Sequence, residues 1–147
     1  MKLLSFLQDV RPDHRGRYLS DIWKFSDAQI ESTHDFIQWV FPLDEPSGAQ
    51  PDAPVLEPPE IELIHKSAPA TMNVEHSTDW FLGFLARSTH WLAPYDHNHL
   101  RITRMIRSNR LLLGELAAES ARNRVLQLLE KSKGKVGETA IGFWMRS

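Results

Sequence analysis

The chain of 147 residues contains no cysteine. This absence excludes disulfide bonds, thiolate nucleophiles and every zinc or iron–sulfur site that is built on cysteine. Long hydrophobic runs are also absent, because no stretch approaches the roughly 18 apolar residues that a membrane-spanning helix needs. The apolar start of the chain ends after Leu7, too early for the hydrophobic region of a signal peptide. We therefore expect a soluble, cytoplasmic protein.

The net charge is small as well, at -2 from 17 basic and 19 acidic residues, but the charges are segregated. Residues 1–24, 25–86 and 87–147 carry net charges of +2, -10 and +6. In the basic part, Arg101, Arg104, Arg107 and Arg110 follow one another at steps of three residues, which spreads them over about half the circumference of a helix. We expect ion pairs of arginine with aspartate or glutamate from different segments to neutralise much of this charge internally.

Apolar residues recur at helical spacing through most of the chain, and no alternating run of strand length appears. The sequence thus predicts an all-α protein of about six or seven helices. Six of the nine prolines lie between Pro42 and Pro59, so a long proline-rich loop is expected over about residues 42–57. The length and the 41% hydrophobic content suit one domain over residues 1–147.

The helix boundaries follow from caps and prolines. A first apolar stripe joins Leu3, Phe6, Leu7 and Val10. Ser26 and Gln29 have the spacing of a capping box and open a helix that continues to Phe41. We further expect a helical start at Pro58 or Pro59, a kink or a restart near Pro69, and a helix over 70–86 with Met72, Phe81, Leu82 and Leu85 inward. Asp96 or Asn98 caps the next helix, and Gly114 marks a break or bend after it. The last two expected helices are one over 115–132, with Leu116, Ala121, Val125, Leu128 and Leu129 on its inner face and Lys131, Lys133 and Gly134 at its end, and one over 138–145 that buries Ile141 and Trp144.

Two segments place polar groups densely among large apolar ones. The first runs His34-Asp35-Phe36-Ile37-Gln38-Trp39-Val40-Phe41-Pro42, and on a helix its His34, Gln38 and Phe41 would share one edge. The second runs from Asp96 to Arg104 and combines free backbone amides at a helix start with two imidazoles and two guanidiniums. Such a combination favours an anion.

The first segment closely resembles the signature H-x-[YF]-I-Q-W-[LV]-F-P of the opioid growth factor receptor conserved-domain family. His97-Asn98-His99-Leu100-Arg101-Ile102-Thr103-Arg104 resembles that family's H-N-x-L-R-I-[ST]-R segment. The resemblance extends from about Leu19 to Trp144 and implies an α-helical domain. In animal members it implies a receptor for an opioid pentapeptide that associates with intracellular and nuclear membranes and is linked to growth inhibition. A bare domain of this size, without a repeat-bearing extension, resembles a stand-alone bacterial member.

We accordingly expect a non-enzymatic binding module for a peptide or a small ligand that carries a carboxylate or phosphate, with no cofactor and no nucleic-acid partner. The ligand would lie between the two motifs, where Trp39 and Phe36 supply apolar contact, Gln38 a hydrogen bond, and Arg101 with His97 a clamp. The expected ligand-binding residues are His34, Phe36, Gln38, Trp39, His97, Asn98, Arg101 and Arg104.

Several alternatives stay open at this point. Ile37, Trp39 and Phe41 are more typical of a core, and Gln38 either satisfies a buried backbone group or lines a pocket. Residues 100–110 would serve a nucleic-acid or acidic-partner surface instead. A metalloprotein is the third alternative, since Glu31 with His34 and Glu62 with His65 have the spacing of carboxylate-bridged di-iron bundles, although chance also explains two such pairs.

Overall fold

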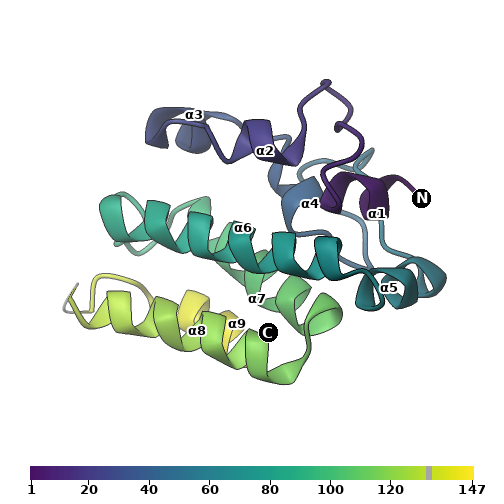
Figure 1. Cartoon of the computed structure of the whole chain (residues 1–147). Helices are drawn as coiled ribbons and strands as arrows, with labels where there is room; N and C mark the ends of the chain where they lie inside the picture. The colour runs from purple at the N-terminus through teal and green to yellow at the C-terminus, as the bar shows by residue number, and fades with distance from the viewer. Residues whose placement is uncertain (132–133) are drawn as a thin grey trace. The chain divides into compact units, whose positions relative to one another are not determined.

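Helices account for all regular secondary structure in the computed structural model, which describes residues 1–131 and 134–147 (Figure 1). No strand occurs in these two ranges, so the all-α prediction is confirmed, with nine helices in place of six or seven. The helices are α1 (Lys2–Leu7), α2 (Leu19–Ile22), α3 (Asp27–Ser32), α4 (Ile37–Val40), α5 (Pro58–His65), α6 (Ala68–Arg87), α7 (Asn98–Leu112), α8 (Glu115–Glu130) and α9 (Glu138–Arg146).

The chain divides into two units, Met1–Ser77 and Thr78–Ser147. The boundary falls inside α6, whose first half belongs to the first unit and whose second half belongs to the second. The expectation of one domain over residues 1–147 stays a prediction.

In the first unit, α1 packs against α4 and α5 through its buried residues Leu3, Phe6 and Leu7. Val10 was expected on the same stripe, but this prediction is wrong because Val10 is 62% exposed. The cause is local, since Asp9 adopts a positive φ of 61° and turns the chain out of the helix before Val10.

The single helix expected from Ser26 to Phe41 is also wrong, although its start is confirmed. Ser26 Oγ accepts the backbone amide of Gln29, and the Gln29 side chain accepts the amide of Ser26. The helix α3 then ends at Ser32, Thr33 is extended, and a new helix α4 begins at Ile37. The interruption lies beside Asp35, whose carboxylate and carbonyl oxygens bind Arg17.

The proline-rich loop is confirmed, because no helix occurs between Val40 and Pro58. Its two ends are joined by a hydrogen bond of 2.8 Å from the Leu56 amide to the Leu43 carbonyl, and both side chains are buried. The expected proline in the first turn of α5 is present. The restart before Pro69 is confirmed too, since Ser67 Oγ accepts the Ala70 amide at 3.3 Å where α6 begins.

In α6 the inward face differs from the expected one at its first position. Met72 is 65% exposed, so its expected burial is wrong, whereas Phe81, Leu82 and Leu85 are buried as predicted. Ala70 and Val74 replace Met72 on the buried stripe, because steps of four and three residues lead from them through Ser77 to Phe81.

The second unit is organised around α7, which packs against α8 and α9. Asn109 of α7 donates from Nδ2 to Thr78 Oγ1 at 3.0 Å, and Arg124 of α8 binds Asp79 at 2.7 Å. On α8, Ala121 and Val125 are buried as expected, but Leu116 is 82% exposed, so that prediction is wrong.

The remaining expectations for the C-terminal part are mixed. Trp144 of α9 is fully buried as expected, whereas Ile141 is only half-buried. Gly134 has a positive φ of 81°, but it does not cap α8 as expected, because α8 ends at Glu130 with Lys131 as its C-cap residue. The predicted helix end at Ser132 and the predicted cap contribution of Lys133 lie outside the described residues.

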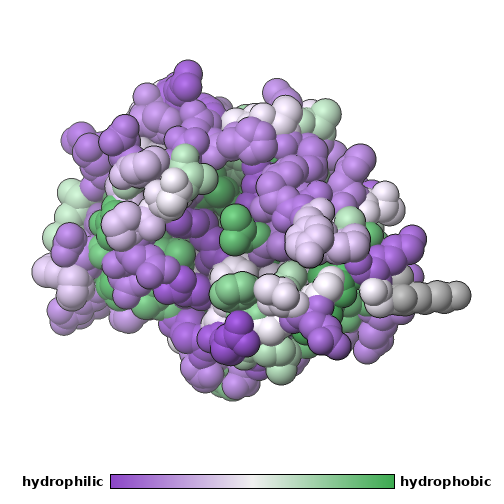
Figure 2. Space-filling model, turned by 180° about the vertical axis from the view of Figure 1, so that it is seen from behind, coloured by the Kyte–Doolittle hydropathy of each residue, from purple (hydrophilic) through white to green (hydrophobic). Residues whose placement is uncertain are grey.

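No helix among the described residues combines the length and the apolar character needed to cross a bilayer. In Figure 2 the face that is drawn is mainly hydrophilic, and hydrophobic atoms appear there as separate patches among polar side chains.

Gly114 separates α7 from α8 with a φ of 107° and a ψ of -178°, a combination that only glycine adopts at low cost. We predict that Gly114→Ala lowers the free energy of unfolding by about 2 kcal/mol through backbone strain alone, since no atom lies within 4 Å of the added Cβ. Urea denaturation measures this. Gly48→Ala is the matched control, because its Cβ also meets nothing while its φ is outside the positive range, and a loss as large as that of Gly114→Ala would contradict the explanation.

Candidate functional site

The first motif forms α4 and lies inside the first unit. Phe36, Val40 and Phe41 have no exposed surface, and Trp39 is 6% exposed. The Trp39 ring meets Phe6 edge-on at a centroid distance of 5.4 Å and stacks on His14 at 5.8 Å. The interpretation of Ile37, Trp39 and Phe41 as core residues is therefore confirmed. Phe36 is enclosed by protein atoms and offers a ligand no surface.

Gln38 uses its amide for the backbone. Its Nε2 donates to the His34 carbonyl at 3.3 Å, and its side chain is buried. Its Oε1 has no hydrogen-bond partner among the described residues. Of the two roles that the sequence left open, satisfying a backbone group is the one observed.

Asp35 is the centre of an ion-pair network. Its carboxylate binds Arg17 Nη1 at 3.0 Å, Arg15 Nε at 3.0 Å and His14 Nε2 at 3.2 Å. Burial raises the pKa of Asp35, but the hydrogen bond and charge of Arg17, with the charges of His14 and Arg15, outweigh it and hold the pKa below its usual value.

Because His34 and Asp35 precede α4 and are not helical, the expected helical edge of His34, Gln38 and Phe41 does not form, and this prediction is wrong. The His34 side chain is exposed instead, and it lines a polar pocket of about 480 Å³ with Arg15, Thr33 and Gln50 among others.

The second motif begins α7. Asp96 Oδ1 accepts the backbone amide of Asn98 at 2.8 Å, which confirms Asp96 as the capping residue. Asn98 is fully buried and accepts a hydrogen bond of 3.3 Å from Arg101 Nη1, and Arg101 is only 5% exposed. The Arg101 guanidinium therefore faces protein atoms, which leaves it no surface on which to clamp a ligand.

A buried aromatic cluster fixes the backbone around this motif. His99 Nε2 lies 2.7 Å from the Trp91 carbonyl, Trp91 Nε1 donates to the Leu85 carbonyl at 2.9 Å, and Trp144 Nε1 donates to the His99 carbonyl at 3.1 Å. The Trp144 ring also meets the His99 ring edge-on at 5.6 Å. The three side chains thereby join α6, the loop after it, α7 and α9.

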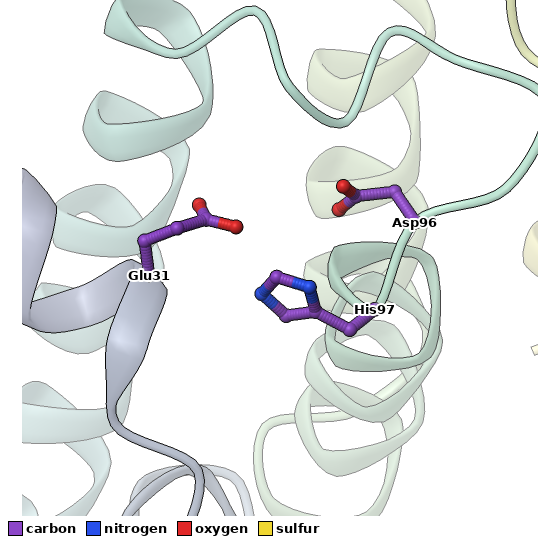
Figure 3. A group of neighbouring side chains, drawn as sticks. All are labelled: Glu31, Asp96 and His97. Atoms are coloured by element: carbon purple, nitrogen blue, oxygen red, sulfur yellow. The ribbon is translucent and has the colours of Figure 1, made fainter.

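A largely apolar groove of about 520 Å³ lies over this cluster, between the start of α7, the loop before it and α9. Its apolar walls are Tyr95, Leu100 and Phe143, which are 92%, 74% and 52% exposed. Asp96 and His97 add polar groups, and Figure 3 shows their side chains at the start of α7. The third labelled residue of that figure, Glu31, belongs to α3 of the first unit. A groove of this size and lining can accept an apolar side chain of a ligand.

Sequence reasoning found only part of this groove. It identified His97 and pointed to Asp96 as a cap, but it missed Tyr95, Leu100 and Phe143. The sequence signal for these residues was weak. Leu100 lies outside the buried apolar stripe of α7, but nothing in the sequence marks it as part of a groove. Of the other expected residues, Asn98 is buried and Arg104 is half-buried, and neither lines the groove.

The arginine series of α7 does not form an exposed basic face. Arg101 is buried, and Arg104, Arg107 and Arg110 are half-buried. Arg110 donates to the Ser147 carbonyl and pairs with Glu115. The expected pairing between the acidic middle segment and the basic C-terminal segment is seen in Arg124 with Asp79. Arg17 of the N-terminal segment also pairs with Asp35 of the acidic segment, which was not predicted.

The geometry for a carboxylate-bridged metal centre is not present at the residues suggested by the sequence. His34 lies beyond the end of α3, so Glu31 and His34 do not share a helix, and Glu62 pairs with Lys66 on the exposed side of α5. Within the described ranges, Glu31, His34, Glu62 and His65 do not come together as one ligand group.

Residues 9–89, more than half of the chain, match the family described as the opioid growth factor receptor (OGFr) conserved region. The chain belongs to this family. The match includes the first motif with its buried α4 and the network around Asp35.

Curated relatives carry the same family name. The chain is 33% identical over 125 residues to the opioid growth factor receptor of Rattus norvegicus, which covers 71% of this chain and 21% of that protein. It is 31% identical over 139 residues to the opioid growth factor receptor-like protein 1 of Rattus norvegicus, with coverage of 81% and 28%. For the opioid growth factor receptor of Homo sapiens the identity is 30% over 138 residues, with coverage of 79% and 20%.

The matched part of this OGFr-family chain thus spans between 20% and 28% of the length of these three relatives. No solved structure shows a significant match to it.

The lowered pKa of Asp35 determines how its contribution to the free energy of unfolding depends on pH. Because the pKa of Asp35 is lowered in the folded state, its contribution to stability is present above the unfolded-state pKa near 4 and is lost as pH falls through the lower folded-state value. We predict that Asp35→Asn lowers the free energy of unfolding at pH 7 by about 2 kcal/mol and makes stability less sensitive to pH between about 5 and 2.

Denaturant unfolding at several pH values measures both effects. Asp44→Asn is the control, since Asp44 is exposed and makes no contact with Arg15 or Arg17. Equal losses for the two variants at pH 7 would show that the Asp35 network contributes nothing specific.

Proposed function

We propose that this OGFr-family chain is a non-enzymatic binding module that receives a short peptide in the groove between α7 and α9. The proposal draws on the names of its relatives, which describe receptors for an opioid growth factor. Because the chain matches only part of those proteins, the proposal is limited to the groove of this chain and to a peptide short enough to bind there.

The observation that carries the proposal is the combination of exposed apolar walls with a fixed floor. Leu100 and Phe143 are exposed side by side with Tyr95 in the lining of one groove, and exposed apolar side chains that gather in this way are typical of a binding surface. The floor is held by the bonds of His99 with Trp91 and Trp144, so the groove is formed before a ligand arrives. A preformed groove binds a ligand more tightly than a flexible one, because fewer side chains and loops lose conformational freedom on binding.

Polar groups at the groove suit the ends or the backbone of a peptide. The Asp96 carboxylate uses Oδ1 for the Asn98 amide and keeps further acceptor capacity for a ligand N–H or ammonium group. The exposed His97 side chain adds a second polar group to the lining of the groove. These groups would orient a ligand whose aromatic or aliphatic side chain fills the apolar part.

We propose binding rather than catalysis because the polar groups deeper in the groove are engaged with the backbone. His99 Nε2 is directed to the Trp91 carbonyl, and the Thr103 hydroxyl donates to the His99 carbonyl at 3.2 Å. A nucleophile with a free general base beside it is the arrangement that hydrolytic chemistry would need there.

Isothermal titration with an opioid pentapeptide tests the proposal. The double variant Leu100→Ala/Phe143→Ala removes two apolar walls, and because both side chains are exposed, the fold should tolerate the change. We expect a loss of affinity of about tenfold or more, corresponding to roughly 1.4 kcal/mol or more.

Leu116→Ala is the matched control, since Leu116 is also an exposed leucine but does not line the groove. A second probe, the same pentapeptide with its aromatic residues replaced by serine, should bind weakly to every variant. Absence of binding by the unmodified chain, or equal affinity for the double variant, would contradict the proposal.

A further inference from the structure

The polar pocket of the first unit is lined by two arginines, Arg15 and Arg17, that a tight turn holds in place. The segment from Asp13 to Arg17 forms a tight turn, in which the Asp13 amide donates to the Arg17 carbonyl at 2.8 Å. The buried Asp13 carboxylate accepts the backbone amides of Arg15 and Arg17 at 2.9 and 3.0 Å. Gly16 supplies the positive φ of 76° that the turn requires. The turn therefore holds Arg15 at a fixed position on the surface.

The guanidinium of Arg15 is anchored on one side only. Its Nε donates to Asp35 Oδ2 at 3.0 Å, and the side chain is 68% exposed. Its two Nη atoms make no hydrogen bond to any residue that the structure describes. Arg17 is different, because its Nε, Nη1 and Nη2 are all directed to Asp13 or Asp35.

When an arginine is held by the protein through Nε, the edge formed by its two Nη atoms faces solvent. Parallel N–H groups on this edge match two oxygens of a carboxylate or phosphate group, which is the strongest geometry that arginine offers to an anion. In this chain the anchor is supplied by protein and the free edge is left at a pocket of about 480 Å³.

The other walls of the pocket are polar and carry further donors. Gln50 contributes a side-chain amide that has no hydrogen bond to the described residues, and the exposed His34 lies on the same wall as Thr33. The nearby formal charges balance, because Arg15 and Arg17 meet Asp13 and Asp35. Binding must therefore rest on directed hydrogen bonds more than on a strong positive field.

We propose that this pocket binds a small oxyanion, a carboxylate or phosphate group, through the Nη edge of Arg15 with the side-chain amide of Gln50 as an additional donor. Arg15 is the residue that recognises the anion, and Asp35 is a positioning residue that fixes its orientation. The site lies wholly in the first unit and does not depend on the peptide groove proposed for the second.

The test is a titration of the whole chain with inorganic phosphate and, separately, with acetate, followed by nuclear magnetic resonance of the arginine Nε–H and backbone amide signals. Sodium chloride replaces the anion to keep the ionic strength constant. We expect saturable shifts at Arg15, Thr33 and His34, with a dissociation constant on the order of 1 mM, as suits a small exposed site. The stronger of the two probes identifies the preferred oxyanion.

Arg15→Gln should weaken oxyanion binding at least fivefold. Arg15→Lys should bind with an affinity between those of Arg15→Gln and the unmodified chain, because lysine keeps the charge but loses the bidentate geometry. Arg11→Gln is the matched control, since Arg11 is an exposed arginine of the same segment that does not line this pocket. A thermal melt checks that each variant is folded.

Shifts that fail to saturate with either probe would overturn the proposal. So would an equal effect of Arg11→Gln and Arg15→Gln, because it would show that general charge is responsible. If Arg15→Gln does not fold, the comparison of Arg15→Lys with the unmodified chain decides, and equal affinities there would also contradict the proposed geometry.

Discussion

A polar group that is buried without a hydrogen-bond partner costs free energy, and both signature motifs of this OGFr-family chain are arranged around that constraint. In the first unit the charge of Asp35 is met by Arg15 and Arg17. Gln38 satisfies the His34 carbonyl through Nε2, although its own Oε1 has no partner among the described residues. In the second unit His99 meets the Trp91 carbonyl. The polar residues that the sequence suggested as functional therefore serve mainly to fix the backbone.

Because the buried polar groups of the motifs bond to the protein itself, exposed residues beside them supply the surfaces proposed for ligand contact. Where Asp35 anchors Arg15 through Nε, the outer edge of the guanidinium remains at the surface. Where His99 and Trp144 fix the floor of the groove, the exposed side chains of Leu100 and Phe143 form its walls. In both units the proposed binding surface combines residues outside the motif, such as Arg15 and Phe143, with exposed members of the motif, such as Leu100, and not the buried members.

Much of the fold could be predicted from local signals. The capping box at Ser26 and Gln29, the proline-rich loop after Phe41 and the cap at Asp96 act over a few residues, and each was found from the sequence. The break between α3 and α4 was not, because it is coupled to contacts of Asp35 with residues about twenty positions earlier. The exposure of Leu100 and the burial of Arg101 likewise depend on which face of α7 meets α9, and periodicity alone does not give this.

Peptide binding in the groove between α7 and α9, as proposed above, is tested most directly by nuclear magnetic resonance. The backbone amide signals of the chain are mapped while an opioid pentapeptide is added. We expect saturable shifts at Tyr95, Leu100, Thr103 and Phe143, which line the groove. Absence of shifts there, with changes confined to other residues or with none at all, would contradict it.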